Sequence, residues 1–227
     1  MKWLLTTVLI LAASMPLAAK DEGTSPGKLE RATEVIQKLT STSPDRGVPR
    51  EIFEGARCVA VIPELVKGAF VVGGEHASGV ASCRTSGGRW SAPAPLLLSG
   101  ISWGQQFGGK STDLVMFIMN DRGANDLRAG HVKIGAGLSA AAGPIGRSAS
   151  AEAGYKAAIL AYSAGKGAFV GVSLRGAELQ QDSKATHEFY SRDVSFGDVL
   201  AGNADTSSAE ARAFQSAVEK AKDSAIR

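Results

Sequence analysis

The first candidate for chemistry is a serine in a Gly-x-Ser-x-Gly motif. Gly100–Gly104 has Ser102 at its centre, and this motif holds the nucleophile of α/β-hydrolases on a sharp turn between a strand and a helix. Leu96–Leu98 supplies the strand, but the glycine-rich segment Gln105–Gly109 is a poor helix start. A catalytic triad would also need an acid and a histidine downstream. The residues that could be nominated, on their position in the chain alone, are Asp113, Asp182 and His187. A serine hydrolase at Ser102 is therefore the least favoured hypothesis.

The histidines do not have the spacing of a metal site. His76, His131 and His187 are isolated, and the sequence contains no His-x₃-His or Cys-x₂-Cys pair. The segment Gly165–Gly167 contains a lysine but lacks the spacing of a phosphate-binding loop, and a glycine hairpin accounts for it. The sequence thus predicts no metal, no cofactor and no enzymatic activity.

Several cations stand beside glycines, in segments typical of tight turns. Exposed backbone amides next to a lysine or an arginine suit an anionic headgroup, and ordinary solvated turns are the alternative interpretation. Arg84 and Arg89 belong to this class of turn cations because they flank Gly87 and Gly88. The candidate lipid-binding residues of this kind are Lys67, Lys110, Arg147 and Lys166.

The segment Lys28–Thr40 is predicted to form an amphipathic helix. Its apolar residues recur at helical spacing, namely Leu29, Ala32, Ile36 and Leu39. Lys28, Arg31 and Lys38 are assigned to the other face and are a second candidate membrane contact. Glutamates interspersed on that face favour simple packing of the helix on the core.

After Arg57 the hydrophobic period changes from that of a helix to that of short strands. Glycine turns separate the predicted strands, and Ser207–Ala225 forms a second amphipathic helix. This order predicts an α+β fold with a curved antiparallel sheet or partial barrel of many short strands and amphipathic helices at the N- and C-terminal ends. The strands are expected at Cys58–Ile62, Ala69–Val72, Gly79–Arg84, Leu96–Leu98, Leu114–Met119, His131–Ile134, Ala157–Tyr162 and Ala168–Leu174.

The N-terminus has the three parts of a secretory signal peptide: a basic start, an apolar run and a small-residue exit. The apolar run is shorter than the roughly 18–20 residues that a membrane anchor requires. We expect cleavage near Ala19 and export to the periplasm or cell envelope. The predicted organisation is a signal peptide at residues 1–19, a flexible lead-in at 20–27 and a single domain at 28–227.

Two cysteines, Cys58 and Cys83, remain in the exported part of the chain. Because export favours oxidation, a disulfide is the first interpretation, and two buried free thiols on neighbouring strands are the alternative. Loss of Lys2 with the signal peptide lowers the net charge from +3 to +2. A charge this small does not favour nucleic acid as a partner.

An ordered set of motifs resembles the SYLF lipid-binding domain over roughly Leu29–Leu200. The motifs are Cys58–Pro63, Lys67–Gly74, Gly79–Arg84, Trp90–Pro93, Gly104–Gly109, Thr112–Val115, Ala142–Arg147, Tyr162–Ser163, Gly167–Leu174 and Phe189–Tyr190. The exported form is similar to the bacterial branch of that family. The resemblance implies a non-enzymatic protein that binds anionic phospholipid at a membrane surface. Fungal members also bind actin, but the chain carries no appended SH3 or zinc-finger module, so actin is not expected as a partner. An envelope protein partner is the alternative.

Overall fold

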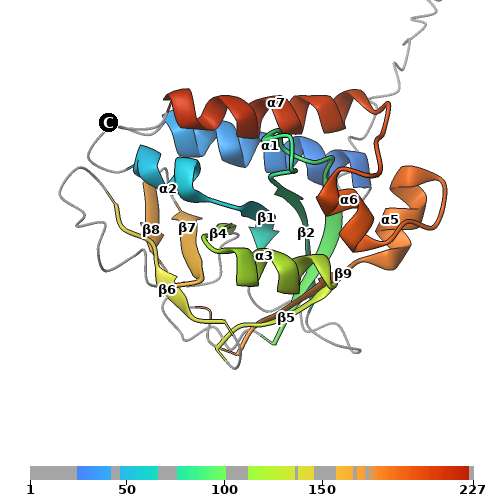
Figure 1. The fold of residues 1–227 in the computed structure, drawn as a ribbon. Helices are drawn as coiled ribbons and strands as arrows, with labels where there is room; N and C mark the ends of the chain where they lie inside the picture. Colours follow the sequence, from blue (N-terminus) through green and yellow to red (C-terminus); the bar gives the residue numbers. More distant parts are fainter. Residues whose placement is uncertain are drawn as a thin grey trace, which may run out of the picture.

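The computed structural model is a curled β-sheet with helices on both of its faces (Figure 1). It describes residues 25–41, 47–65, 76–100, 112–135, 138–145, 157–165, 168–171, 174 and 176–224. The strands are β1 (Cys58–Leu65), β2 (His76–Cys83), β3 (Ala94–Ser99), β4 (Thr112–Ile118), β5 (His131–Lys133), β6 (Ala140–Ala142), β7 (Ile159–Gly165), β8 (Ala168–Gly171) and β9 (Glu178–Gln181). The helices are α1 (Ser25–Ser41), α2 (Arg50–Gly55), α3 (Asp121–Arg128), α5 (Ser183–Tyr190), α6 (Phe196–Ala201) and α7 (Ala209–Ser224).

The nine described strands form one sheet in the order β5-β9-β3-β2-β1-β4-β7-β6, with β8 also paired to β7. All of these pairings are antiparallel except that of β6, which runs parallel to β7. The mixed α+β class and the curved sheet predicted from the sequence are thus confirmed. The predicted strand Ala69–Val72 lies outside the described residues.

Alternating side chains of the central strands supply two separate hydrophobic cores. On β1, Cys58, Ala60 and Ile62 enter the core enclosed by the curl of the sheet, together with α3 and α6. Val59 and Val61 enter the core on the opposite face, beneath α1, α2 and α7. Because both faces are buried, β1 is apolar at successive positions, as is expected of a strand covered on both sides.

The two long helices lie side by side over one face of the sheet (Figure 1). Leu29, Ile36 and Leu39 of α1 are buried there with Phe214 of α7. This arrangement confirms the predicted amphipathic character of both terminal helices. Within the described ranges, no helix is both long enough and apolar enough to cross a membrane.

Cys58 and Cys83 form a disulfide between β1 and β2. They stand directly opposite each other in the antiparallel register, and both are fully buried in the enclosed core. Ser91 supports the bridge, because its Oγ accepts a hydrogen bond of 3.1 Å from the Cys83 backbone amide. The disulfide expected from an even cysteine count is therefore present, and the alternative of two free thiols is wrong.

Arg84 has a structural role, although the sequence grouped it with the turn cations. Its guanidinium donates to the carbonyl oxygens of Ala56 at 3.1 Å and Phe53 at 3.1 Å, at the C-terminal end of α2. It also lies over the Trp90 ring, 4.6 Å from the ring centroid. Arg84 thus holds α2 against the turn that follows β2.

Replacing Arg84 by methionine is expected to lower the free energy of unfolding by roughly 2–4 kcal/mol, because hydrogen bonds from a charged donor are worth about 1.5–3 kcal/mol each and the carbonyls would lose their donor. Chemical denaturation of the purified variant measures the effect. Arg89→Met is the matched control, since Arg89 is exposed and should change stability by less than about 0.5 kcal/mol. Equal effects of the two substitutions would contradict this role.

Candidate functional site

One end of the sheet, which we call the loop end, gathers the ends of strands that are far apart in the sequence. Leu65 at the end of β1 pairs with Thr112 at the start of β4. Asp113 pairs with Ala164 near the end of β7. Gly165, the last residue of β7, pairs with Ala168, the first residue of β8. His76 at the start of β2 pairs with Ser99 at the end of β3. The connections that leave these strand ends therefore start from the same side of the fold.

Four of the predicted lipid-binding residues belong in sequence to these connections, but they lie outside the described residues: Lys67, Lys110, Arg147 and Lys166. Lys67 stands two positions after Leu65, and Lys110 stands two positions before Thr112. Lys166 follows the last residue of β7. Arg147 follows β6, which runs in the same direction as β7. The described strands next to these positions, β1, β4, β7 and β6, are thus neighbours in the sheet, although almost a hundred residues of sequence separate Lys67 from Lys166.

The three remaining predicted contacts lie on α1, which crosses β2, β1 and β4 near the loop end. Arg31 forms an ion pair of 3.6 Å with Glu64 of β1, and Lys38 forms one of 3.7 Å with Asp113 of β4. Lys28 lies beside β2. At 3.6 residues per turn, the three positions span an arc of about 80° on the helix. They flank the buried stripe of α1. The sequence pattern alone had assigned them to the face opposite the core.

Glu64 and Asp113 are the acidic partners that the sequence did not reveal as part of this site. Glu64 follows Pro63 in an irregular stretch of β1, and its φ of 51° is in the left-handed region. Its backbone amide donates a hydrogen bond of 3.1 Å to Oδ1 of Asp113. The Arg31 and Lys38 side chains keep 32% and 45% of their surface exposed, so these pairs remain accessible to competing ions.

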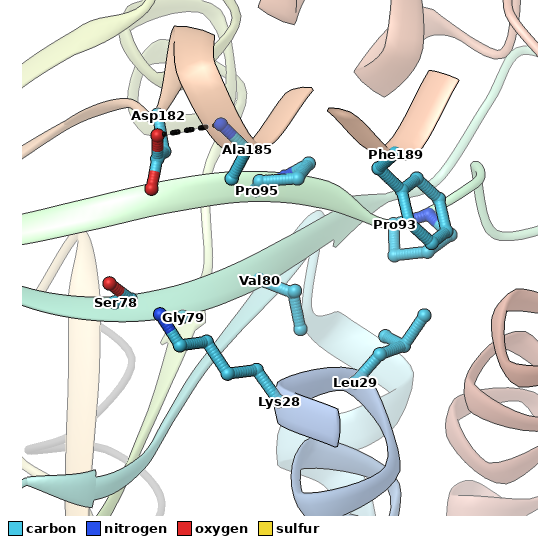
Figure 2. Close-up of a pocket in the computed structure, with 10 residues that line it drawn as sticks. All are labelled: Lys28, Leu29, Ser78, Gly79, Val80, Pro93, Pro95, Asp182, Ala185 and Phe189. Atoms are coloured by element: carbon cyan, nitrogen blue, oxygen red, sulfur yellow. Dashed lines mark hydrogen bonds between the residues drawn. The ribbon is translucent and has the colours of Figure 1, made fainter. Parts of the chain in front are cut away.

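A small pocket lies where the start of α1 meets β2, β3 and α5 (Figure 2). Its walls are mainly apolar, and Lys28, Ser78 and Asp182 are its side chains with polar groups. The pocket is shallow, because only about 20 Å³ of it is accessible to the centre of a water-sized group and the rest of the depression is open to solvent. The apolar lining consists of Leu29, Gly79, Val80, Pro93, Pro95, Ala185 and Phe189.

The wall that α5 contributes to this pocket is held in place by polar contacts at both ends of the helix. Asp182 caps α5 by accepting a hydrogen bond of 2.9 Å from the Ala185 amide. At the other end, the Tyr190 hydroxyl donates to the carbonyl oxygen of Pro93 at 2.9 Å. Burial raises the pKa of Tyr190 well above its ordinary value, so the phenol stays neutral and keeps donating across the physiological range.

The groups nominated for catalysis are engaged elsewhere. Asp113 binds Lys38 and the Glu64 amide, Asp182 caps α5, and the His187 ring pairs with Asp193 at 2.8 Å. Ser102 lies outside the described residues. In the part of the chain that the structure describes, His, Cys, Asp and Glu side chains form no group of three that is suited to a metal ion. The described geometry offers charged and apolar contacts for a ligand.

Comparison with known proteins finds a matching family model and several relatives. A family model named Ysc84 and described as "Las17-binding protein actin regulator" matches residues 99–221. SH3 domain-containing YSC84-like protein 1 of Homo sapiens is 29% identical over 192 residues, which cover 83% of this chain and 55% of that protein. LAS seventeen-binding protein 3 of Saccharomyces cerevisiae is 35% identical over 164 residues, which cover 70% of this chain and 35% of that protein.

The chain spans about half the length of the human protein and about a third of the yeast one. The matched region of the family model starts at the end of β3 and continues into α7. It thus includes the start of β4, with Asp113, and most of the second half of the sheet. The chain therefore belongs to the Ysc84 family, which is the SYLF family that its motifs resemble.

Proposed function

We propose that the chain is a non-enzymatic protein of the cell envelope that binds anionic phospholipid headgroups through the loop end of its sheet, after removal of Met1–Ala19. The observation that supports this proposal is that strand ends far apart in the sequence lie together at the loop end. The chain continues from those ends into segments that contain Lys67, Lys110, Arg147 and Lys166. The cations of α1 border the same end.

Binding of this kind depends on long-range attraction more than on enclosure of the lipid. Each lysine or arginine near an anionic surface contributes about 1 kcal/mol, and the attraction falls off within a Debye length. The pocket beside α1 has room for about one water-sized group, about 20 Å³, which is too small for an acyl chain. We therefore expect the protein to bind the membrane surface and not to extract a lipid into its core.

Co-sedimentation with liposomes tests this function. Binding is expected to increase with the content of phosphatidylglycerol and to decrease as salt is raised. The triple substitution Lys67→Glu, Lys110→Glu and Lys166→Glu should weaken binding by about 100-fold or more, because it removes three contributions of about 1 kcal/mol each and adds repulsion.

The matched control carries the same change of charge away from the loop end, with Arg122, Lys184 and Lys220 replaced by glutamate. These residues are exposed on α3, α5 and α7, and their replacement should weaken binding far less than the loop-end triple does. Liposome binding that ignores lipid charge and salt, or equal losses in the two triples, would contradict the proposal.

A protein partner is the second candidate function. It is favoured by the description of the matched family, which names Las17 binding and actin regulation, and by the name of the yeast relative. A single protein recovered in stoichiometric amount from envelope extracts, together with no liposome binding, would favour it over lipid. Co-sedimentation with filamentous actin tests separately our prediction that actin is not a partner of this chain.

A further inference from the structure

The pocket between α1, β2, β3 and α5 has the composition of a binding site for one anionic group attached to an apolar body. We propose that this pocket binds the phosphate of a single phospholipid molecule through Lys28 and Ser78, and its glycerol ester region through the apolar walls. The inference rests on the proposed function and names one point of contact within it.

Lys28 differs from the other two cations of α1 in its partners. Arg31 and Lys38 are paired with Glu64 and Asp113. Among the described residues, no hydrogen bond or ion pair engages the Lys28 side chain. Yet Lys28 is only partly exposed and lines an apolar depression. A partly desolvated ammonium gains most from a bound counter-ion, since less of its charge is screened by water.

The polar groups of the pocket are arranged for an anion at one rim. Figure 2 shows the Lys28 amine and the Ser78 hydroxyl on the same side of the depression, next to β2. Asp182 is the carboxylate that lines the pocket; its Oδ1 accepts from the amide of Ala185 at the first turn of α5, and its other oxygen points away from that amide. The helix N-terminus offsets its negative charge, so Asp182 opposes an anion at the Lys28 rim only weakly.

The pocket is shallow: about 20 Å³ of it is enclosed enough for one water-sized group, and the rest of the depression is open to solvent. A bound headgroup would therefore rest on the rim, and its ester region would lie on the apolar surface beside it. Leu29, Val80 and Phe189 offer surface for ester and methylene groups next to the bound phosphate. A free phosphate ion would leave this apolar surface in contact with water, so the lipid should bind more tightly than the ion.

A soluble short-chain lipid separates this site from general attraction to a membrane. Dihexanoyl phosphatidylglycerol is titrated below its micelle concentration into the purified protein, with calorimetry and amide chemical shifts as readouts. Lys28→Met, which keeps the stem and removes the charge, should weaken binding about tenfold or more, the effect of one charge-assisted hydrogen bond. Lys28→Arg should retain most of the affinity.

Lys184→Met is the matched control, because Lys184 is exposed on α5 and does not line the pocket. It should leave the affinity within about twofold of the original. Inorganic phosphate should bind at least about tenfold more weakly than the lipid, since it lacks the apolar contact. Equal affinity for phosphate would assign the pocket to a free ion and overturn the proposal.

The outcomes distinguish this site from the proposed function. An unchanged melting temperature would show that the Lys28→Met variant is folded. If that variant binds the monomeric lipid as well as the original protein does, the pocket assignment is wrong. Salt-sensitive liposome binding by the same variant would then leave the proposed function standing. If neither the original protein nor any variant binds anionic liposomes, the proposed function is wrong, and this inference is wrong with it.

Discussion

Replacement of both Cys58 and Cys83 by alanine is expected to lower the free energy of unfolding by about 3 kcal/mol. The disulfide closes a loop with a sequence separation of 25 residues, and loops of about this length are stabilised by roughly 3 kcal/mol through the restriction of the unfolded chain. Both sulfurs are buried in the enclosed core, so their removal also leaves a small cavity. In a domain of this size, the melting temperature should fall by roughly 6–12 °C.

Thermal and chemical denaturation measure this effect in the presence and absence of a reductant. Reduction should destabilise the original protein to a similar extent, while the double alanine variant should not respond to the reductant. An original protein whose melting temperature stays the same once thiol titration shows that the bridge has been reduced would show that the bridge contributes nothing to stability.

Substitution of Gly143 by alanine is expected to destabilise the protein by roughly 1–3 kcal/mol, the usual cost of overpacking a core. A Cβ at this position would overlap the ring of Tyr162, which is fully buried. The ring has no room to withdraw, because it packs edge-on against Phe117 with centroids 5.7 Å apart and its hydroxyl donates to the Pro144 carbonyl at 3.1 Å.

A double-mutant cycle isolates the steric cause. In a Tyr162→Ala background the same Gly143→Ala change should cost less than about 0.5 kcal/mol, since the overlap is gone. Gly87→Ala serves as control: a Cβ there meets nothing closer than the Thr85 Oγ1 at 3.8 Å. An equal cost of Gly143→Ala with and without the Tyr162 ring would place its effect in the backbone and not in packing.

Periodicity located the elements that have a strong local signal. The helix expected at Lys28–Thr40 is α1, extended by three residues at its start, and the strand expected at Leu114–Met119 is β4, shifted toward its start. The strand β9 was missed, because Glu178–Gln181 is only four residues long and contains a single apolar residue, Leu179. Its pairing with β3 and β5 supplies the stability that the segment itself lacks.

The sequence named the cations of the candidate site but not the acidic partners of those on α1. Turn glycines next to lysines indicated anion binding, yet nothing in the sequence linked Arg31 to Glu64 or Lys38 to Asp113. Those pairs depend on how α1 crosses three strands, a tertiary arrangement that no local pattern encodes. Arg84 shows the opposite error, since a cation in a glycine-rich turn was counted for binding while its guanidinium holds the end of α2.

The position of the disulfide has a mechanical consequence for the proposed binding surface. Cys58 and Cys83 join β1 and β2 at the end remote from the loop end, and the two strands pair only from there to Val61 and Val80. Beyond these residues β1 continues alongside β4, and β2 continues alongside β3. The two strands are therefore joined covalently at one end and have different neighbours at the other. Among the described residues, the pairing of β1 with β2 ends at Val61 and Val80, so the covalent link fixes the register of the two strands at the opposite end, inside the enclosed core.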